Sequence, residues 1–162
     1  MLTLFLFTFI RKFKYGKVEI KELTTLAEMT SQLELIRQLY PKMTFQKYES
    51  FLKEMIPHKY TQIAVFDNNK CIGITGCWFS TKLWSGKYLE IDNFVVDEAH
   101  RSQGIGKMLT DFIEQKALAL GCTNIVLDAF TTNFKAHRFY YNQGYAPKGF
   151  HFVKILDKDG LT

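Results

Sequence analysis

The feature that most constrains the fold is a change of hydrophobic period near residue 100. Residues 88–96 alternate as a β-strand does, whereas the apolar residues after Gly104 recur at helical spacing. A short loop joins the two patterns, and Gly104 and Gly106 open the helical one. A strand that passes through such a turn into an amphipathic helix indicates a mixed α/β domain.

The rest of the chain predicts a sheet interrupted by helices, with the order strand, helix, helix, three strands, helix, strand, helix, strand. The expected strands are residues 17–22, 60–66, 71–79, 88–96, 124–129 and 150–156. The expected helices are a first one from Thr25 to Pro41, then residues 45–55, 104–121 and 133–142. No internal repeat or linker divides the chain, so one domain is expected.

Composition narrows the class of protein. The 162 residues are 47% hydrophobic and 23% charged, which is ordinary for a globular domain and argues against disorder. No apolar run approaches the roughly 20 residues that span a bilayer. Three cysteines without a disulfide pattern favour a reducing, cytoplasmic location. The basic residues are scattered, so no nucleic-acid partner is expected, although a net charge of +5 suits a small polyanionic ligand.

The first 16 residues differ from the remainder. An apolar run is followed by Arg11, Lys12 and Lys14, with no acidic residue. We therefore place a boundary between residues 1–16 and residues 17–162. Three interpretations of the extension remain open: an extra strand or packing arm, an extension from an upstream start codon, or an interfacial membrane anchor whose basic residues meet the lipid surface.

The loop before the third helix has the chemistry of an anion site. The first turn of a helix leaves backbone N–H groups unpaired and carries the positive end of the helix dipole. Glycines let a diphosphate approach the backbone, and Arg101 and Lys107 add positive charge. The alternative is that Gly104 and Gly106 only form a tight turn. A Walker A loop is excluded because Met108 follows Gly106-Lys107, and a dinucleotide fingerprint because no third glycine follows.

Two motifs resemble those of the Gcn5-related N-acetyltransferases (GNAT), which bind acetyl-coenzyme A. The first is [RQ]-x-x-G-x-[GA], present as Arg101, Ser102, Gln103, Gly104, Ile105 and Gly106. The second is N-x-x-A-x-x-F-Y-x-x-x-G-[FY], present as Asn133, Ala136, Phe139, Tyr140, Gly144 and Tyr145. The resemblance covers about residues 17–156. It implies an α/β (α+β) fold with a mixed, twisted sheet, flanking helices, and a fourth and a fifth strand that splay apart around the coenzyme.

The resemblance also assigns the acetyl-CoA contacts. The loop from Arg101 to Lys107 would hold the diphosphate, and the backbone of Phe94, Val95 and Val96 would pair with the pantetheine arm. Asn133 would cap its helix and contact the coenzyme. We expect no metal. The sequence positions of His58, His100, His137 and His151 show no metal-ligand spacing, so these histidines are interpreted as solvated or structural.

The strand before the loop supplies candidate bases. Alternation predicts that Glu90, Asp92, Phe94 and Val96 share one face, and that Leu89, Ile91 and Val95 share the other. Two carboxylates on one face would attract a cationic amine and could accept its proton. The resemblance ranks Glu90 ahead of Asp92 as the base. The alternative is that one of the two is salt-bridged or faces solvent.

The resemblance gives Tyr140 the role of general acid, which protonates the leaving thiolate, and Phe139 is expected to pack inward. Without the motif, Tyr140 would be an ordinary aromatic residue at helical spacing.

The expected activity is that of an acyltransferase, an N-acetyltransferase that acts in a ternary complex on a small-molecule or peptide amine. The alternatives are an inactive acetyl-CoA-binding regulatory module, or a membrane- or nucleic-acid-associated binding protein that uses residues 1–16. A homodimer is left open.

Overall fold

The protein forms one mixed six-stranded sheet in the order β1-β2-β3-β4-β5-β6. The computed structural model describes residues 9–13 and 16–157, with side chains from residue 18. All neighbouring strands are antiparallel except β5 and β6, which are parallel. The strands are β1 (Phe9–Phe13), β2 (Gly16–Leu23), β3 (Tyr60–Asp67), β4 (Lys70–Lys82), β5 (Gly86–Val96) and β6 (Asn124–Leu127).

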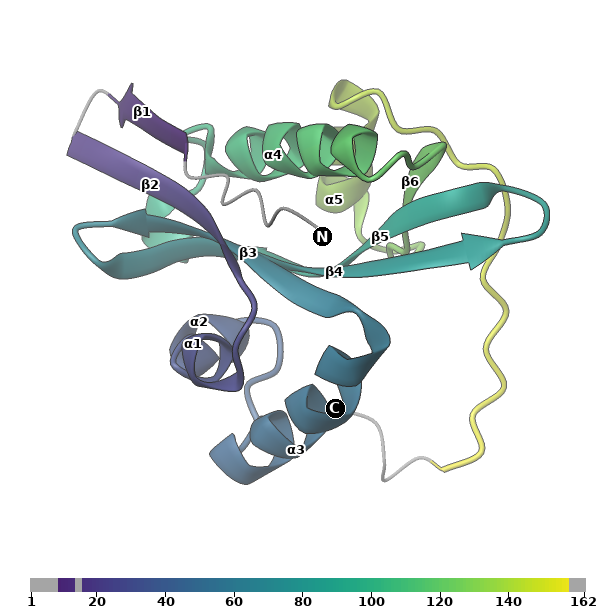
Figure 1. Ribbon diagram of the computed structural model, residues 1–162, viewed down its shortest axis with the longest axis horizontal. Helices are drawn as coiled ribbons and strands as arrows, with labels where there is room; N and C mark the ends of the chain where they lie inside the picture. The colour runs from purple at the N-terminus through teal and green to yellow at the C-terminus, as the bar shows by residue number, and fades with distance from the viewer. Residues whose placement is uncertain (1–8, 14–15, 158–162) are drawn as a thin grey trace, which may run out of the picture.

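Helices cover both faces of this sheet. The first three lie on one side, and α4 and α5 lie on the other (Figure 1). The helices are α1 (Leu26–Thr30), α2 (Leu33–Ile36), α3 (Phe45–Met55), α4 (Ile105–Ala119) and α5 (Phe134–Asn142). Two short 3₁₀ turns, Ile56–His58 and Glu98–His100, precede β3 and α4. The fold is therefore the mixed, helix-flanked sheet that the sequence predicts.

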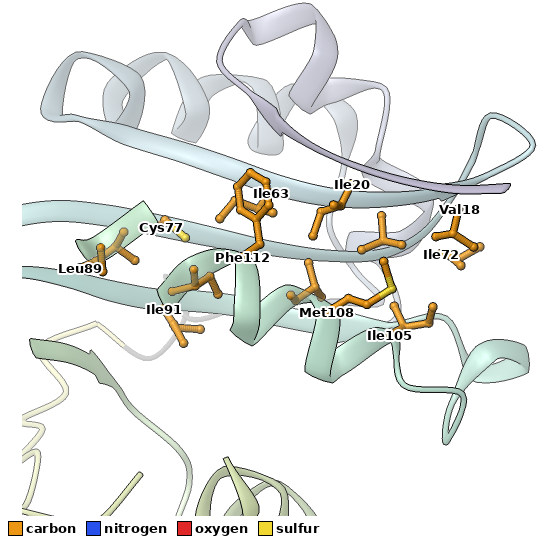
Figure 2. Packing of buried hydrophobic residues seen from close by; sticks show 14 residues of the cluster. Val18, Ile20, Ile63, Ile72, Cys77, Leu89, Ile91, Ile105, Met108 and Phe112 are labelled. Carbon is orange, nitrogen blue, oxygen red and sulfur yellow. The ribbon is translucent and has the colours of Figure 1, made fainter. Parts of the chain in front are cut away.

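Each face of the sheet has its own core. On the α4 side, Ile105, Met108 and Phe112 recur along the helix and are buried against β2, β3, β4 and β5 (Figure 2). On the other side, Met29 of α1 and Leu52 of α3 are fully buried against the same strands. The sheet is thus held rigidly between two apolar layers, and it provides a fixed base for side chains at its open end.

The expected first helix, from Thr25 to Pro41, is in fact two short helices. Thr25 and Glu28 form the predicted capping box. Helix α1 then ends at Thr30, where side-chain hydroxyls bond to helix carbonyls: Thr30 Oγ1 donates to Leu26 O at 2.9 Å and Ser31 Oγ donates to Glu28 O at 2.7 Å. Such local bonds compete with the helix ladder, which the hydrophobic period alone does not reveal.

The expected final strand, residues 150–156, is absent. These residues are irregular, and large apolar side chains on them are exposed: Phe150 by 84%, Phe152 by 89% and Leu156 by 89%. Strand β6 is also shorter than expected, with four residues where six were predicted. Alternation indicates a strand only where a neighbouring strand supplies hydrogen bonds, and this segment forms no ladder.

At the other end of the chain, residues 9–13 form β1 along β2, with Phe9 opposite Ile20 and Phe13 opposite Gly16. This pairing agrees with the strand interpretation of that part of the extension. Residues 1–8 and 14–15 lie outside the described residues, so the predictions made for those parts of the extension are not addressed by the structure. Within the described parts of the chain, no helix is long and apolar enough to cross a membrane.

Candidate active site

The site is organised by a bulge in β5. Ile74 of β4 pairs with Val95, but the next aligned pair is Gly76 with Asp92, so β5 has an extra residue there. Within this stretch Asn93 has a φ of 53°, in the left-handed region that Asn tolerates better than most residues.

Two tyrosines hold the side chain of Asn93. Tyr40 Oη donates to Asn93 Oδ1 at 2.6 Å, and Asn93 Nδ2 donates to Tyr60 Oη at 3.5 Å. Tyr40 follows α2 and Tyr60 begins β3, so the bulge is held by two separate elements. Burial and the nearby charge of Asp92 raise the pKa of Tyr40, which keeps its hydroxyl protonated as a donor.

The bulge overturns the predicted division of β5 into two faces. Before it, Leu89 and Ile91 lie in the α4-side core; after it, Val95 lies in the core on the opposite side. Phe94 and Val96 pack against the α4-side core. Glu90 and Asp92 therefore do share a face, but Phe94 and Val96 are on the other one. The extra residue reverses the alternation of every position after it.

Next to the bulge, β5 and β6 separate. Their pairing begins with Tyr88 opposite Asn124 and ends with Ile91 opposite Leu127, whereas β5 continues to Val96. The backbone of residues 92–96 consequently has no β6 partner. This is the predicted splay between the fourth and fifth strands of the core sheet, here β5 and β6. An unpaired strand edge can receive an extended ligand through main-chain hydrogen bonds.

The loop from β5 to α4 has the backbone geometry expected of an anion-binding turn. Ser102 has a φ of 60° and Gly104, the residue that caps α4, has a φ of 85°. The first helical bond runs from Met108 N to Gly104 O at 3.0 Å, so the preceding amides are the unpaired first turn of the helix. They can donate to a phosphate and, with the helix dipole, favour negative charge.

Asp97 anchors this loop to the sheet. Its carboxylate accepts from Ala99 N at 2.9 Å and lies 3.1 Å from Lys70 Nζ and 3.3 Å from His100 Nδ1, while its backbone N–H donates to Ile72 O at 2.9 Å. Desolvation opposes ionisation here, but the bonds from Lys70 and Ala99 outweigh it and lower the pKa of Asp97. The loop is thus fixed at its start by a charged side chain.

The two basic side chains predicted to lie near the loop, Arg101 and Lys107, are both exposed. Arg101 pairs with Glu98 at 3.2 Å and its Nε donates to Val96 O at 3.4 Å, while Lys107 pairs with Asp111 at 2.6 Å. Exposed ion pairs of this kind contribute little stability and rearrange readily. Both side chains can therefore turn to a phosphate without a large cost.

Gly106 has a packing role that the motif did not reveal. A Cβ at this position would lie 3.1 Å from the ring of Phe139 and 3.7 Å from that of Phe94. Phe139 therefore packs inward, as predicted, and it does so against the backbone of α4. The second glycine of the motif permits the close approach of α4 and α5.

Tyr140 lies beside this contact. Its ring centroid is 5.2 Å from that of Phe139, 6.0 Å from that of Phe94 and 5.5 Å from that of Tyr145. Burial, with a smaller contribution from Tyr145, raises the pKa of Tyr140 above its ordinary value, so the phenol keeps its proton at neutral pH. At the start of the same helix, Asn133 Oδ1 accepts from Ala136 N at 3.2 Å, which is the predicted cap.

The carboxylates of Glu90 and Asp92 differ in their surroundings. Asp92 Oδ2 accepts a hydrogen bond from Trp78 Nε1 at 3.2 Å, and its backbone carbonyl accepts from Thr75 Oγ1 at 3.1 Å. Glu90 instead lines an open cleft of about 730 Å³, together with Trp78 and Tyr88. Glu90 is therefore the more accessible of the two to a ligand.

Cys77 is buried and Cys71 is partly buried, and neither thiol is suited to nucleophilic chemistry. Burial raises the pKa of Cys77 to about 12 and that of Cys71 to about 12, so both thiols stay protonated. Within the described residues, no group of three or more His, Cys, Asp or Glu side chains could hold a metal ion.

Sequence reasoning missed Asn93, Tyr40 and Trp78. The available signal was weak: an Asn between apolar strand residues is one of the few types that adopt positive φ, and it can mark a bulge. Tyr40 and Trp78 carry no local signal. Each reaches the site only because α2 and β4 are packed around β5.

Comparison with known proteins agrees with this geometry. The Acetyltransferase (GNAT) family matches residues 28–145. An uncharacterised N-acetyltransferase of Bacillus subtilis, YhdJ, is 24% identical over 139 residues, which cover 85% of this chain and 98% of that protein. An aminoalkylphosphonate N-acetyltransferase of Salmonella typhimurium is 32% identical over 104 residues, covering 62% of this chain and 65% of that protein.

Among solved structures, the aminoglycoside N-acetyltransferase AAC(6′)-Iy in complex with CoA superimposes with a TM-score of 0.73 at 15% identity. The match covers 86% of this chain and 95% of that one. The family match extends over more than half of the chain, so the protein belongs to the GNAT acetyltransferase family, whose members use acetyl-CoA.

Proposed function

We propose that the protein transfers the acetyl group of acetyl-CoA to an amine by direct attack in a ternary complex. One observation carries this proposal: the edge of β5 becomes unpaired after Ile91 and leads directly into the anion-binding turn at the start of α4. A long ligand that ends in a diphosphate matches this arrangement. The coenzyme would supply the activated acetyl thioester.

The residues of the chain would divide the binding of acetyl-CoA between them. Gly104, Ile105, Gly106 and Lys107 would donate first-turn amides to the diphosphate, with Arg101, Ser102 and Gln103 at the entrance to the turn. The backbone of Phe94, Val95 and Val96 would pair with the pantetheine arm. Asn133 caps α5, and in this position it would also contact the coenzyme.

Glu90, Asp92 and Tyr140 would carry the proton transfers. An ordinary primary amine has a pKa of about 10.4 and arrives as a cation at neutral pH. The charges of Glu90 and Asp92 would attract it, and the more accessible Glu90 would take a proton from it. Tyr140, which remains protonated, would donate to the departing thiolate.

The acceptor is proposed to be a small primary amine. The relative from Salmonella typhimurium is named for aminoalkylphosphonates and AAC(6′)-Iy for aminoglycosides, and both classes of compound carry amines. A cleft of about 730 Å³ is within the usual size range of small-molecule sites. Residues 17–162 would constitute the catalytic domain. The proposal includes no nucleic acid or metal, and it places the protein in the cytoplasm.

The first experiment is a screen for thiol release from acetyl-CoA with four amine classes: aminoalkylphosphonates, aminoglycosides, amino acids and peptides. Turnover with any of them supports the proposal. Binding of acetyl-CoA by calorimetry without turnover on any class would instead indicate a regulatory acetyl-CoA-binding module.

The second experiment tests the roles of the carboxylates. Glu90→Gln should lower kcat/KM strongly at pH 7 and much less near pH 10, where the amine is already neutral. Asp92→Asn should act mainly on KM through lost attraction for the cation. The opposite pattern would exchange the two roles, and the absence of pH rescue in both variants would remove the base from this strand.

A further inference from the structure

The proposed function leaves open which group holds the acceptor amine while it reacts. Glu90 and Asp92 share a face of β5 and would attract a cation, but of the two only Glu90 lines the cleft of about 730 Å³. A charge attracts an ammonium group without fixing its direction, whereas attack on a thioester needs a defined approach. A second contact beside Glu90 is therefore needed.

Trp78 links the cleft to Asp92. It is the residue of β4 that pairs with Glu90 across the antiparallel ladder, so the two side chains project from the same face of the sheet. Like Glu90, Trp78 lines the cleft. Its indole Nε1 donates a hydrogen bond to Asp92 Oδ2 at 3.2 Å. One side chain therefore reaches the open cleft and also holds the carboxylate that does not line it.

The indole ring of Trp78 is held in place by the core. Its centroid is 4.8 Å from that of Tyr60, which is buried. Tyr60 is confined in turn, because a Cβ at Gly76 would collide with its hydroxyl group. With Tyr60 against the ring and Asp92 at the N–H, the indole is fixed at two points while it stays only partly buried. A wall that is already ordered loses little entropy when a ligand binds against it.

Three aromatic residues line the cleft, and two of their rings already carry a cation. Lys59 Nζ lies 5.2 Å from the ring centroid of Phe79. Lys82 Nζ lies 4.5 Å from that of Tyr88. Within the part of the chain that the structure describes, no lysine or arginine lies over the ring of Trp78. Since indole attracts cations more strongly than the other aromatic side chains, Trp78 is the aromatic wall available to an ammonium ligand.

We propose, on the basis of the proposed function, that Trp78 positions the acceptor amine. The ammonium group rests against the indole ring, next to Glu90 on the paired strand, which takes its proton. The indole N–H can only donate, so it occupies Oδ2 of Asp92 and keeps that carboxylate turned toward the ring. The charge of Asp92 then helps to bind the amine, while Glu90 remains the accessible base.

The kinetic test uses the full chain and the amine that gives the fastest thiol release in the screen. Trp78→Leu removes both the ring and the N–H and should raise KM for the amine about tenfold. Trp78→Phe keeps an aromatic face and should raise KM less. In both variants kcat should change less than about threefold, because the groups that transfer protons are intact. Trp84→Phe, at the exposed turn between β4 and β5, replaces the other tryptophan of the chain and is the matched control, with KM unchanged.

A double-mutant cycle tests the hydrogen bond between Trp78 and Asp92. Asp92→Asn should raise KM for the amine in the unmodified protein. In the Trp78→Phe background the same change should raise KM by a factor about threefold smaller, because the carboxylate is no longer oriented before it is replaced. Equal effects in the two backgrounds would show that Trp78 does not act through Asp92 and would overturn that part of the proposal.

Fluorescence tests the contact between the ring and the amine directly. In the Trp84→Phe variant Trp78 is the only tryptophan, so its emission reports on this site. Titration with the same amine in the presence of CoA, which has no acetyl group to transfer, should change the emission until the site is saturated. The alcohol in which a hydroxyl replaces the amino group should not. Unchanged emission at amine concentrations that saturate binding by calorimetry would overturn the ring contact.

The outcomes separate the role of Trp78 from the proposed function. Calorimetry should give the same acetyl-CoA affinity for each variant and the unmodified protein, which shows that the variants are folded. If Trp78→Leu does not fold, KM of Trp78→Phe and the emission of Trp78 decide. An unchanged KM, or a loss confined to kcat, would overturn the role of Trp78 while the acetyltransferase activity stands. No turnover by the unmodified protein with any amine class would overturn the proposed function, and the role of Trp78 with it.

Discussion

The loop from β5 to α4, residues 97–104, and the C-terminal segment, residues 146–157, are built differently. The loop is anchored by the bonds of Asp97 and ends in an αL glycine that caps α4, a 15-residue helix with one face buried. The segment forms no ladder and exposes Phe150 and Leu156. A turn is specified by residues within it, whereas a strand requires a partner.

The largest expected effect tests the rigid support of the loop. Leu109 is fully buried on α4 and Leu156 is 89% exposed. Leu109→Ala should reduce the free energy of unfolding by about 2–5 kcal/mol, because it leaves a cavity. Leu156→Ala, the same change in the exposed segment, should cost less than about 0.5 kcal/mol. Urea unfolding measures both, and a loss above about 1 kcal/mol for Leu156→Ala would show that the segment is packed.

The next effect concerns chemistry at α5. Tyr140→Phe keeps the ring contacts with Phe94 and Tyr145 but removes the proton donor. We expect kcat to fall about 10²-fold with little change in acetyl-CoA affinity. Tyr141→Phe, at an exposed position on the same helix, is the control and should have no such effect. A loss of only twofold would reduce Tyr140 to a packing residue.

A smaller effect is expected from the turn itself. Gly104→Val places a branched side chain at a φ of 85° and beside the first-turn amides. The dissociation constant for acetyl-CoA should rise at least tenfold, or about 1.4 kcal/mol, by calorimetry. Gly104→Asn should be milder because Asn tolerates this conformation. Equal and unchanged affinities in folded variants would contradict the assignment of the diphosphate site.

The smallest effect is a pH dependence at the anchor of the loop. Because the pKa of Asp97 is lowered by Lys70 and Ala99 in the folded state, its stabilisation is present above the ordinary carboxyl pKa and is lost as pH falls through the folded value. Asp97→Asn should cost under about 1 kcal/mol at pH 7 and nearly nothing near pH 2, measured by urea unfolding. A cost independent of pH would show that the charge of Asp97 contributes nothing.

The sequence predicted most of the elements because their signals are local. The capping box at Thr25, the Asn133 cap and the glycines at the ends of α4 and α5 all occur where they were expected. The site residues were less well placed. Glu90 and Asp92 share a face as predicted, but Phe94 and Val96 do not join them, since an unpredicted residue intervenes in the ladder.

The sequence by itself determined the family motifs, the helix caps and the glycine that begins α4, since each depends on residues a few positions apart. Tertiary structure decided which side chains meet. Tyr40 and Tyr60 reach the Asn93 bulge from other elements, and Asp128 meets His151 only after the chain has passed through α5. The energy of such contacts comes from partners distant in sequence, so no local pattern encodes them.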